Sequence, residues 1–302
     1  MKNKFNINKI NFLIVGAARS GSTTLYDYLK IHPDIYLPDL KEPHFFSGVS
    51  PMINTKEEYI GIFNNYQGES AVGEASTSYL FVPSTAKNIF DNLGKIKIII
   101  ILRNPVDRAY STWLQSHDHR DIENLSFEDA LKMEESRYQN RHELYFWPSV
   151  MYFRAGLYFE QVNRYINTFG KENIYVLIFE EFIKNPIFYC KRIYSFLNVN
   201  DSYTPPIMIK NKYSKPRIQF LYDFISPPPK LFLSLYKKFP NKIRQYIYLL
   251  VSKIHKANRN DAVKKQPLST DTRKELQNKY YENIKKLEEL LERDLSIWYK
   301  DN

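Results

Sequence analysis

The apolar run at residues 96–102, which reads "IKIIIIL", limits the fold of this chain more than any other feature. A run of this length without polar alternation predicts a strand buried on both faces, as in a parallel sheet covered by helices. Apolar runs also occur at 12–15, 35–37 and 174–179, and another short strand is expected just before residue 73. The sequence therefore predicts a central parallel sheet.

Helical patterns fill the intervals between these apolar runs. They occur at 22–31, 83–93, 105–117, 156–169 and 185–197. Strands that alternate with helices imply right-handed crossovers, which place helices on both faces of a sheet. We therefore expect the α/β class, as a three-layer sandwich.

The last third of the chain has a different pattern. Residues 226–230, "SPPPK", interrupt regular structure, and residues 231–255 mix apolar, aromatic and basic side chains at loose helical spacing. That stretch fits either a helical layer packed on the protein or a peripheral contact with a membrane surface. A further helix is expected at 269–298, after a serine or threonine cap. No firm boundary appears, so we expect one domain of 302 residues whose part at about 220–302 is mainly helical.

Composition narrows the function classes. The net charge of +10 fits an acidic ligand, an acidic polymer or a membrane surface, and it also fits simple solubility. The single cysteine, Cys190, excludes an internal disulfide and a cysteine-built zinc site, and it is consistent with a reducing cytoplasm. Near the start of the chain, the apolar stretch "FLIVGAA" is only seven residues long and is interrupted by Arg19, so it predicts a buried strand and not a secretory signal. We expect a cytoplasmic protein, at the inner membrane surface if 231–255 binds lipid.

The stretch "FLIVGAARSGSTTL" has the strand, turn and helix of a phosphate-binding loop. Such loops read G-x-x-x-x-G-K-[ST], and here Gly16 and Gly21 keep the frame, Ser22 replaces the lysine and Thr23 follows. Backbone N–H groups from Gly21 to Thr23 would point at an anion, and the hydroxyls of Ser20, Ser22 and Thr23 would add donors. Because the lysine is missing, magnesium-dependent phosphoryl transfer is disfavoured.

A second anion site is expected in "ILRNPVDRAYS". Arg103 follows the buried strand, and Ser111 lies eight residues later on the next predicted helix, so both side chains can reach one anion. Arginine suits phosphate because its planar fork donates two hydrogen bonds. Two anion sites at one edge of a parallel sheet indicate a nucleotide that is phosphorylated at both ends.

With these motifs the chain resembles the sulfotransferases that use 3′-phosphoadenosine 5′-phosphosulfate (PAPS), in particular bacterial and heparan-sulfate-type members. The resemblance implies a P-loop-like phosphosulfate loop in which Arg19 contacts the transferring group, and a 3′-phosphate site at Arg103 and Ser111. It also implies that Lys215 and Arg217, in a late loop, lie near the nucleotide. PAPS would be the co-substrate, 3′-phosphoadenosine 5′-phosphate (PAP) the product, and no metal would be needed.

The acceptor side is expected in "KEPHFF". By the same resemblance Glu42 matches the general base and His44 a catalytic histidine, although Ser47 stands where one branch has an aspartate. The alternatives are that Glu42 is a solvated carboxylate paired with Lys41, and that His44 packs against neighbouring phenylalanines. "GEASTSY", residues 73–79, supplies a glutamate and a serine expected to line the cleft.

The implied function is transfer of a sulfuryl group from PAPS to a hydroxyl or amine acceptor, first of all on a carbohydrate. A lipid, a small metabolite or a protein tyrosine stays open as acceptor, because fold and donor do not specify it. Two rival functions are an atypical P-loop kinase and a non-catalytic basic protein that binds nucleic acid or an acidic polymer. The 24 tyrosines and 20 phenylalanines could stack on bases, but no RNA-binding motif is visible, which disfavours nucleic acid.

Overall fold

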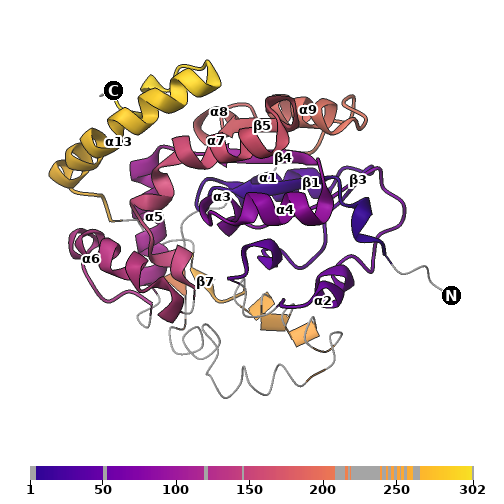
Figure 1. Cartoon of the computed structure of the whole chain (residues 1–302), viewed down its shortest axis with the longest axis horizontal. Helices are drawn as coiled ribbons and strands as arrows, with labels where there is room; N and C mark the ends of the chain where they lie inside the picture. Colours follow the sequence, from indigo (N-terminus) through magenta and orange to yellow (C-terminus); the bar gives the residue numbers. More distant parts are fainter. Residues whose placement is uncertain are drawn as a thin grey trace.

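A computed structural model describes residues 5–49, 53–118, 122–144, 146–207, 215–216 and 266–300, with separate positions between 218 and 260. A five-stranded sheet with the order β2-β3-β1-β4-β5 lies at its centre, and all of its strand pairs are parallel (Figure 1). The strands are β1 (Phe12–Gly16), β2 (Ile35–Tyr36), β3 (Ala71–Ala75), β4 (Lys97–Leu102) and β5 (Ile174–Ile178). Each predicted strand is therefore found, although β3 ends later than expected.

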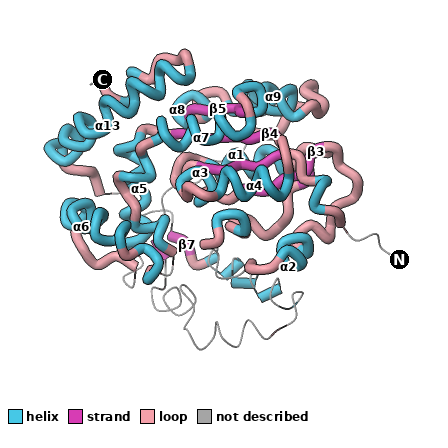
Figure 2. The backbone as a smooth tube through the Cα atoms, viewed as in Figure 1, coloured by secondary structure: helices cyan, strands magenta, loops and turns pink. Residues whose placement is uncertain are grey.

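Helices cover both faces of this sheet, as the ribbon and the tube views show (Figures 1 and 2). One face is covered by α1 (Ser22–Lys30), α8 (Phe179–Phe182) and α9 (Pro186–Leu197). The other face is covered by α3 (Ser78–Phe81), α4 (Thr85–Leu93) and α7 (Tyr158–Phe169), and α13 (Thr270–Leu291) packs on α7 and on α5 (Pro105–His117). Residues of α2 (Lys56–Gly61) and α6 (Phe127–Gln139) join the same hydrophobic core. The expected α/β sandwich is confirmed.

Alternate residues of each central strand supply the two cores. Leu13 and Val15 join the core beneath α4 and α7, whereas Phe12 and Ile14 join the core beneath α1 and α9. The run 96–102 divides in the same way, and residues 98–102 are fully buried. This is why a parallel strand covered on both faces needs apolar residues at every position.

Two predictions about element ends are wrong. β3 extends to Ala75, so Glu74 lies within the strand instead of after it. The last helix ends at Leu291 and not at 298, because Glu292 takes a left-handed conformation with φ 51° and reverses the chain. A short antiparallel pair, β6 (Lys215–Pro216) and β7 (Arg259–Asn260), forms a separate small sheet.

The segment at 231–255, for which either a helical layer or a membrane-surface contact was predicted, lies largely outside the described residues. Within the described part of the chain, no helix has the length and apolar character needed to cross a membrane.

The C-terminal turn packs directly behind the end of β4. Trp298 is 1% exposed, and its indole N–H donates to Glu180 Oε2 over 3.2 Å. The backbone N–H of Asn104 donates to Glu180 Oε1, and the Asn104 side chain donates to the carbonyl of Trp298. Since Asn104 also caps α5, the C-terminus supports the start of the helix that carries Ser111.

We expect Trp298→Ala to lower the free energy of unfolding by about 3–5 kcal/mol, the range for removing a large buried aromatic side chain. Urea unfolding measures the change. Ile297→Ala is the matched control, because Ile297 is adjacent and 41% exposed, and it should cost well under 1 kcal/mol. Equal losses for the two variants would contradict the role given to Trp298.

Candidate functional site

The loop between β1 and α1 is held at the carboxyl edge of the sheet. Ala17 N donates to the carbonyl of Ile101 over 2.7 Å, and the pairing of β1 with β4 is irregular between Ile14 and Gly16. Such bulges bend a strand and redirect the chain beside functional sites. The loop that follows residue 16 therefore leaves the sheet next to the end of β4.

The N-terminus of α1 is built to receive an anion. Its N-cap is Gly21, in the left-handed region at φ 90°, and no side chain caps the helix. A Cβ at Gly21 would lie 2.6 Å from the ring of Phe179, so glycine is required there for space as well as conformation. The first-turn N–H groups are left for an external acceptor, which is how helix N-termini bind phosphate-like groups. This feature fits the predicted phosphosulfate loop.

The hydroxyl groups of the loop are not equally placed. Ser20 is fully buried beside Tyr158, Ser22 is 5% exposed, and Thr23 is exposed. Only Thr23 therefore presents its side chain openly at the helix start, and anion contacts of the Ser20 and Ser22 hydroxyls stay a prediction.

The structure brings the two predicted anion sites into direct contact. Arg19 Nε donates to Ser111 Oγ over 3.2 Å, and Arg103 Nη1 donates to the carbonyl of Arg19 over 3.2 Å. Arg103 follows the last residue of β4, and Ser111 lies on α5, as expected. Among the described residues no carboxylate lies within 4 Å of Arg103. The three residues form one cationic cluster beside the α1 N-terminus.

Two aromatic residues that the sequence did not indicate hold this cluster. The Arg103 guanidinium lies 5.0 Å from the centre of the Phe179 ring, the ring that also packs on Gly21. The Tyr158 hydroxyl donates to the carbonyl of Arg103 over 2.9 Å. Both come from segments far along the chain, so no local motif identifies them. Their contacts limit where the arginine can move.

The predicted acceptor loop lies at the end of the neighbouring strand β3. Glu42 N donates to the carbonyl of Ala75 over 2.9 Å, and Glu42 and His44 both take left-handed backbone conformations, at φ 60° and 53°. Such conformations are costly for residues other than glycine and often occur at functional sites. The loop is therefore held in one particular geometry.

Glu42 is held as a carboxylate by three neighbours. Lys41 Nζ lies 2.8 Å from Oε1, while Thr77 Oγ1 donates to Oε2 over 2.8 Å and His44 Nε2 lies 3.1 Å from Oε2. Burial alone would raise the pKa of Glu42, but the charge of Lys41 and the hydrogen bond from His44 outweigh it and hold the pKa well below its usual range. The side chain remains 30% exposed. The predicted pairing with Lys41 is thus present, and it leaves the carboxylate accessible.

Thr77 connects this carboxylate to the anion loop. Its carbonyl lies 3.1 Å from where a Cβ of Gly16 would be, so Thr77 packs against the residue at which the loop begins. Its hydroxyl donates to Glu42, as described above. Glu42 therefore lies beside the loop, on the side of β3.

His44 has a defined partner at each ring nitrogen. Nδ1 lies 2.7 Å from Ser78 Oγ, and Nε2 faces Glu42. Ser47, which replaces the expected aspartate, bonds to Ser78 as well. The His44 ring lies 5.0 Å from that of Phe146, and its packing against Phe45 and Phe46 stays a prediction.

Glu74 and Ser76 do not line the cleft, and that expectation is wrong. Both are 0% exposed. Ser76 Oγ donates to Glu74 Oε2 over 2.9 Å and accepts the N–H of His44, also over 2.9 Å. The tyrosines at 59 and 79 cover the carboxyl group, and its burial raises the pKa of Glu74 to about 7. The pair therefore supports the acceptor loop from beneath.

The remaining predicted residues are not placed by the structure. Lys215 begins β6, but its side chain is not described, and Arg217 lies outside the described residues. Their nucleotide contacts stay predictions. In the described part of the chain, no three His, Cys, Asp or Glu side chains gather as metal ligands would. The prediction that no metal is needed stays a prediction as well.

An uncapped helix start, a cationic cluster and an accessible carboxylate at one edge of a parallel sheet form a site suited to an anionic group. A family model for the sulfotransferase domain matches residues 9–215. The chain therefore belongs to the sulfotransferase family, and the resemblance seen in the sequence is confirmed.

A solved structure and two curated relatives agree with this assignment. The sulfotransferase from Alicyclobacillus acidocaldarius is 32% identical, with a TM-score of 0.70 over 96% of this chain and 99% of that one. The membrane-associated sulfotransferase kil1 of Dictyostelium discoideum is 34% identical over 41% of this chain and 28% of its own length. Carbohydrate sulfotransferase 15 of Mus musculus is 25% identical over 63% of this chain and 44% of its own. The chain thus spans less than half the length of these two curated relatives.

The buried Glu74 carboxyl predicts a pH dependence of stability. The folded protein keeps this proton up to about pH 7, whereas the unfolded chain releases it near its ordinary pKa of 4.5. Between these values the folded state binds more protons, so the free energy of unfolding falls as the pH rises, by roughly 3 kcal/mol in all. The amide of Glu74→Gln does not titrate, so the free energy of unfolding of this variant should not show this fall with pH.

Urea unfolding at several pH values from 4.5 to 7.5 measures the effect. The matched control is Glu57→Gln, an exposed carboxylate at the start of α2, which should keep the wild-type slope. An unchanged slope in Glu74→Gln would show that this carboxyl group is not protonated in the folded protein.

Proposed function

We propose that the chain transfers the sulfuryl group of PAPS to a hydroxyl or amine acceptor, most directly on a carbohydrate, with Glu42 as the general base. The observation that carries the proposal is the hydrogen-bonded cluster of Arg19, Arg103 and Ser111 beside the uncapped N-terminus of α1. One part of this cluster suits a phosphosulfate and the other a 3′-phosphate. The carbohydrate sulfotransferase among the relatives supports the acceptor class.

The residues of the chain have separable roles in this proposal. When bound, PAPS supplies the sulfuryl group. Arg19 and the first-turn N–H groups of α1 stabilise negative charge near the loop, where fixed donors are more effective than water. Arg103 and Ser111 hold the 3′-phosphate. The contacts with Phe179 and Tyr158 fix the position of Arg103 before binding, and Ser111 is hydrogen-bonded to Arg19.

Glu42 has the protonation state that a base requires. Its low pKa keeps the carboxylate ionised at neutral pH, so Oε2 can accept the proton of an attacking hydroxyl. His44, at 3.1 Å from the same oxygen, orients it.

We further propose a cytoplasmic location, with peripheral contact of 231–255 at the inner membrane surface.

The donor assignment predicts binding of PAP without metal. At a hundredfold excess over the dissociation constant, PAP should stabilise the protein by about 2.7 kcal/mol. Arg103→Ala should weaken PAP binding by roughly 1.5–3 kcal/mol, the range for a hydrogen bond to a charged group. Thermal shift and calorimetry in the presence of a metal chelator measure both values.

Adenosine 5′-phosphosulfate is the matched ligand, because it lacks the 3′-phosphate and its binding should change little in Arg103→Ala. Arg192→Ala, on α9, is the matched protein control and should bind PAP normally. If Arg103→Ala lost equal affinity for both ligands, Arg103 would act only by holding the Arg19 carbonyl. Stabilisation by ATP and magnesium, without any by PAP, would favour the kinase alternative.

The base assignment predicts that Glu42→Gln separates binding from chemistry. The amide keeps size and polarity but cannot accept the proton, so turnover should fall about 10²–10⁴-fold while PAP affinity stays nearly unchanged. Single-turnover kinetics, with PAP affinity measured in parallel, give both values. If Glu42 serves only its ion pair with Lys41, Glu42→Gln should lower the free energy of unfolding by well under 1 kcal/mol and leave turnover unchanged. Near-normal turnover of Glu42→Gln would contradict the assignment of Glu42 as general base and make His44 the residue to test.

A further inference from the structure

One peptide unit beside the anion cluster is held from both sides by side chains that the sequence did not indicate. It joins Arg103 to Asn104, directly after β4. Its carbonyl oxygen accepts the Tyr158 hydroxyl over 2.9 Å, and its N–H donates to Glu180 Oε1, also over 2.9 Å. Because a peptide unit is planar, these two hydrogen bonds together fix its orientation.

The orientation of this peptide unit determines how Arg103 and Ser111 lie relative to each other. A rotation of the unit would change ψ of Arg103 and φ of Asn104, the two dihedral angles between the strand and the next helix. Asn104 caps that helix, α5, since its Oδ1 accepts the N–H groups of Val106 and Asp107 over 3.0 and 3.3 Å. The unit therefore sets the direction of the Arg103 side chain against the helix that carries Ser111.

Glu180 also connects this peptide unit to the C-terminal turn, Ser296–Trp298. Its second oxygen, Oε2, accepts the indole N–H of Trp298 over 3.2 Å. The Trp298 ring lies 5.9 Å from the ring of Tyr158. The turn thus contacts both side chains that hold the peptide unit, although it lies outside residues 9–215, which the family model matches.

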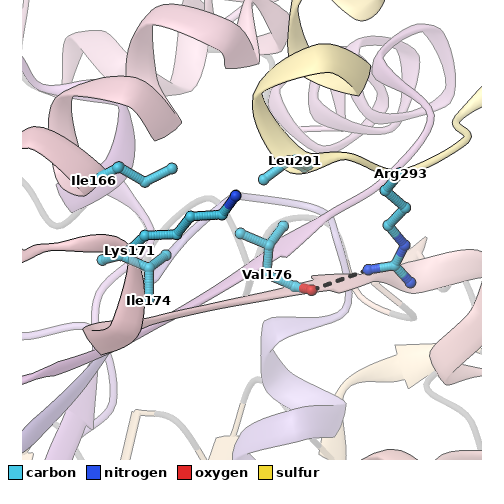
Figure 3. A pocket seen from close by; sticks show the side chains of 6 residues that line it. All are labelled: Ile166, Lys171, Ile174, Val176, Leu291 and Arg293. Carbon is cyan, nitrogen blue, oxygen red and sulfur yellow. Dashed lines mark hydrogen bonds between the residues drawn. The ribbon is translucent and has the colours of Figure 1, made fainter.

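The adjacent carboxyl group, that of Glu181, holds the same C-terminal segment at another point. Arg293 donates to Glu181 and, over 3.2 Å, to the carbonyl of Val176, beside the cavity of about 180 Å³ in Figure 3. This contact attaches the residues after α13 to β5. In the described part of the chain, Glu180 is the one of these two carboxyl groups that is bonded to the peptide unit after β4.

We propose that Glu180 is a positioning residue of the nucleotide site and that, through it, the C-terminal turn contributes to selection of the 3′-phosphate. This rests on the proposed function, because it assumes that Arg103 and Ser111 bind that phosphate. Both oxygens of Glu180 accept hydrogen bonds from the protein, so it acts through Arg103 and not by contact with the ligand. A carboxylate near an anion site repels the ligand, so the benefit of Glu180 is geometric.

The experiment compares two nucleotides that differ only in the 3′-phosphate, PAP and adenosine 5′-monophosphate (AMP). Calorimetry on the full chain, with a metal chelator present, gives the ratio of the two affinities. Glu180→Gln keeps the size of the side chain but replaces one acceptor oxygen with an N–H donor, which opposes the Asn104 N–H or the Trp298 indole. We expect the preference for PAP over AMP to fall about tenfold, nearly all of it through PAP. Removal of the negative charge alone would raise this preference, so the sign of the change separates geometry from charge.

Trp298→Phe tests the connection to the C-terminal turn, because it removes the indole donor and keeps a ring beside Tyr158. We expect the preference for PAP to fall about threefold. In the double variant the amide oxygen of Glu180→Gln can face the Asn104 N–H without opposition from the indole. The double variant should therefore lose no more than Glu180→Gln alone, as expected for two residues that act through one contact.

Glu181→Gln is the matched control, because it weakens the attachment of the same segment at Arg293. It should lower the free energy of unfolding, which urea unfolding measures for every variant, and leave the preference for PAP unchanged. A wild-type protein that does not prefer PAP to AMP would refute the proposed function and this proposal with it. If the wild type prefers PAP, and Glu180→Gln retains or increases that preference or Glu181→Gln lowers it equally, the positioning role alone is overturned.

Discussion

The hydrogen bond from Arg103 to the carbonyl of Arg19 joins the carboxyl ends of two strands, β4 and β1, on which the anion site depends. It spans 3.2 Å and connects the residue after β4 to the loop after β1. It forms because these strands are parallel neighbours, so their carboxyl ends meet at one edge. A one-residue shift in their register would turn every side chain of β4 to the opposite core. The anion site therefore depends on the packing of both cores.

The charges of the site are arranged asymmetrically. On the donor side, Arg103 has no carboxylate within 4 Å among the described residues, so an anionic ligand supplies the missing charge. On the acceptor side, Glu42 is balanced by Lys41 and His44. This balance lowers the proton affinity of Glu42 below that of an isolated carboxylate, but it keeps the side chain ionised. In the proposed reaction a weak base is sufficient, because the acceptor proton becomes acidic during attack, as Brønsted behaviour allows.

The sequence predicted the elements that depend on local patterns. The apolar run at 96–102 predicted β4. The position of Arg103 directly after this run, with Ser111 on the next helix, predicted that both residues belong to one anion site. Contacts between distant segments were not predictable in this way. Phe179 and Tyr158 reach Arg103 from 76 and 55 positions away, respectively, and no spacing rule connects them. The early end of α13 was missed for a related reason, because the left-handed residue there is Glu292 and not the glycine or asparagine that usually signals a helix end.

The acceptor loop shows how the fold maintains a costly backbone. Left-handed conformations at Glu42 and His44 cost roughly 1–2 kcal/mol each. The preceding strand, β2, has only two residues and can offset little of this. The compensation comes from β3 and α3, where the Ala75 carbonyl, the Ser76 hydroxyl and the Tyr79 hydroxyl accept the N–H groups of residues 42, 44 and 46. β3 thus positions Glu42, the proposed base, while β1 and β4 position the anion cluster. Because β3 and β1 are adjacent strands with fixed register, the separation between Glu42 and the anion cluster is set by the sheet itself.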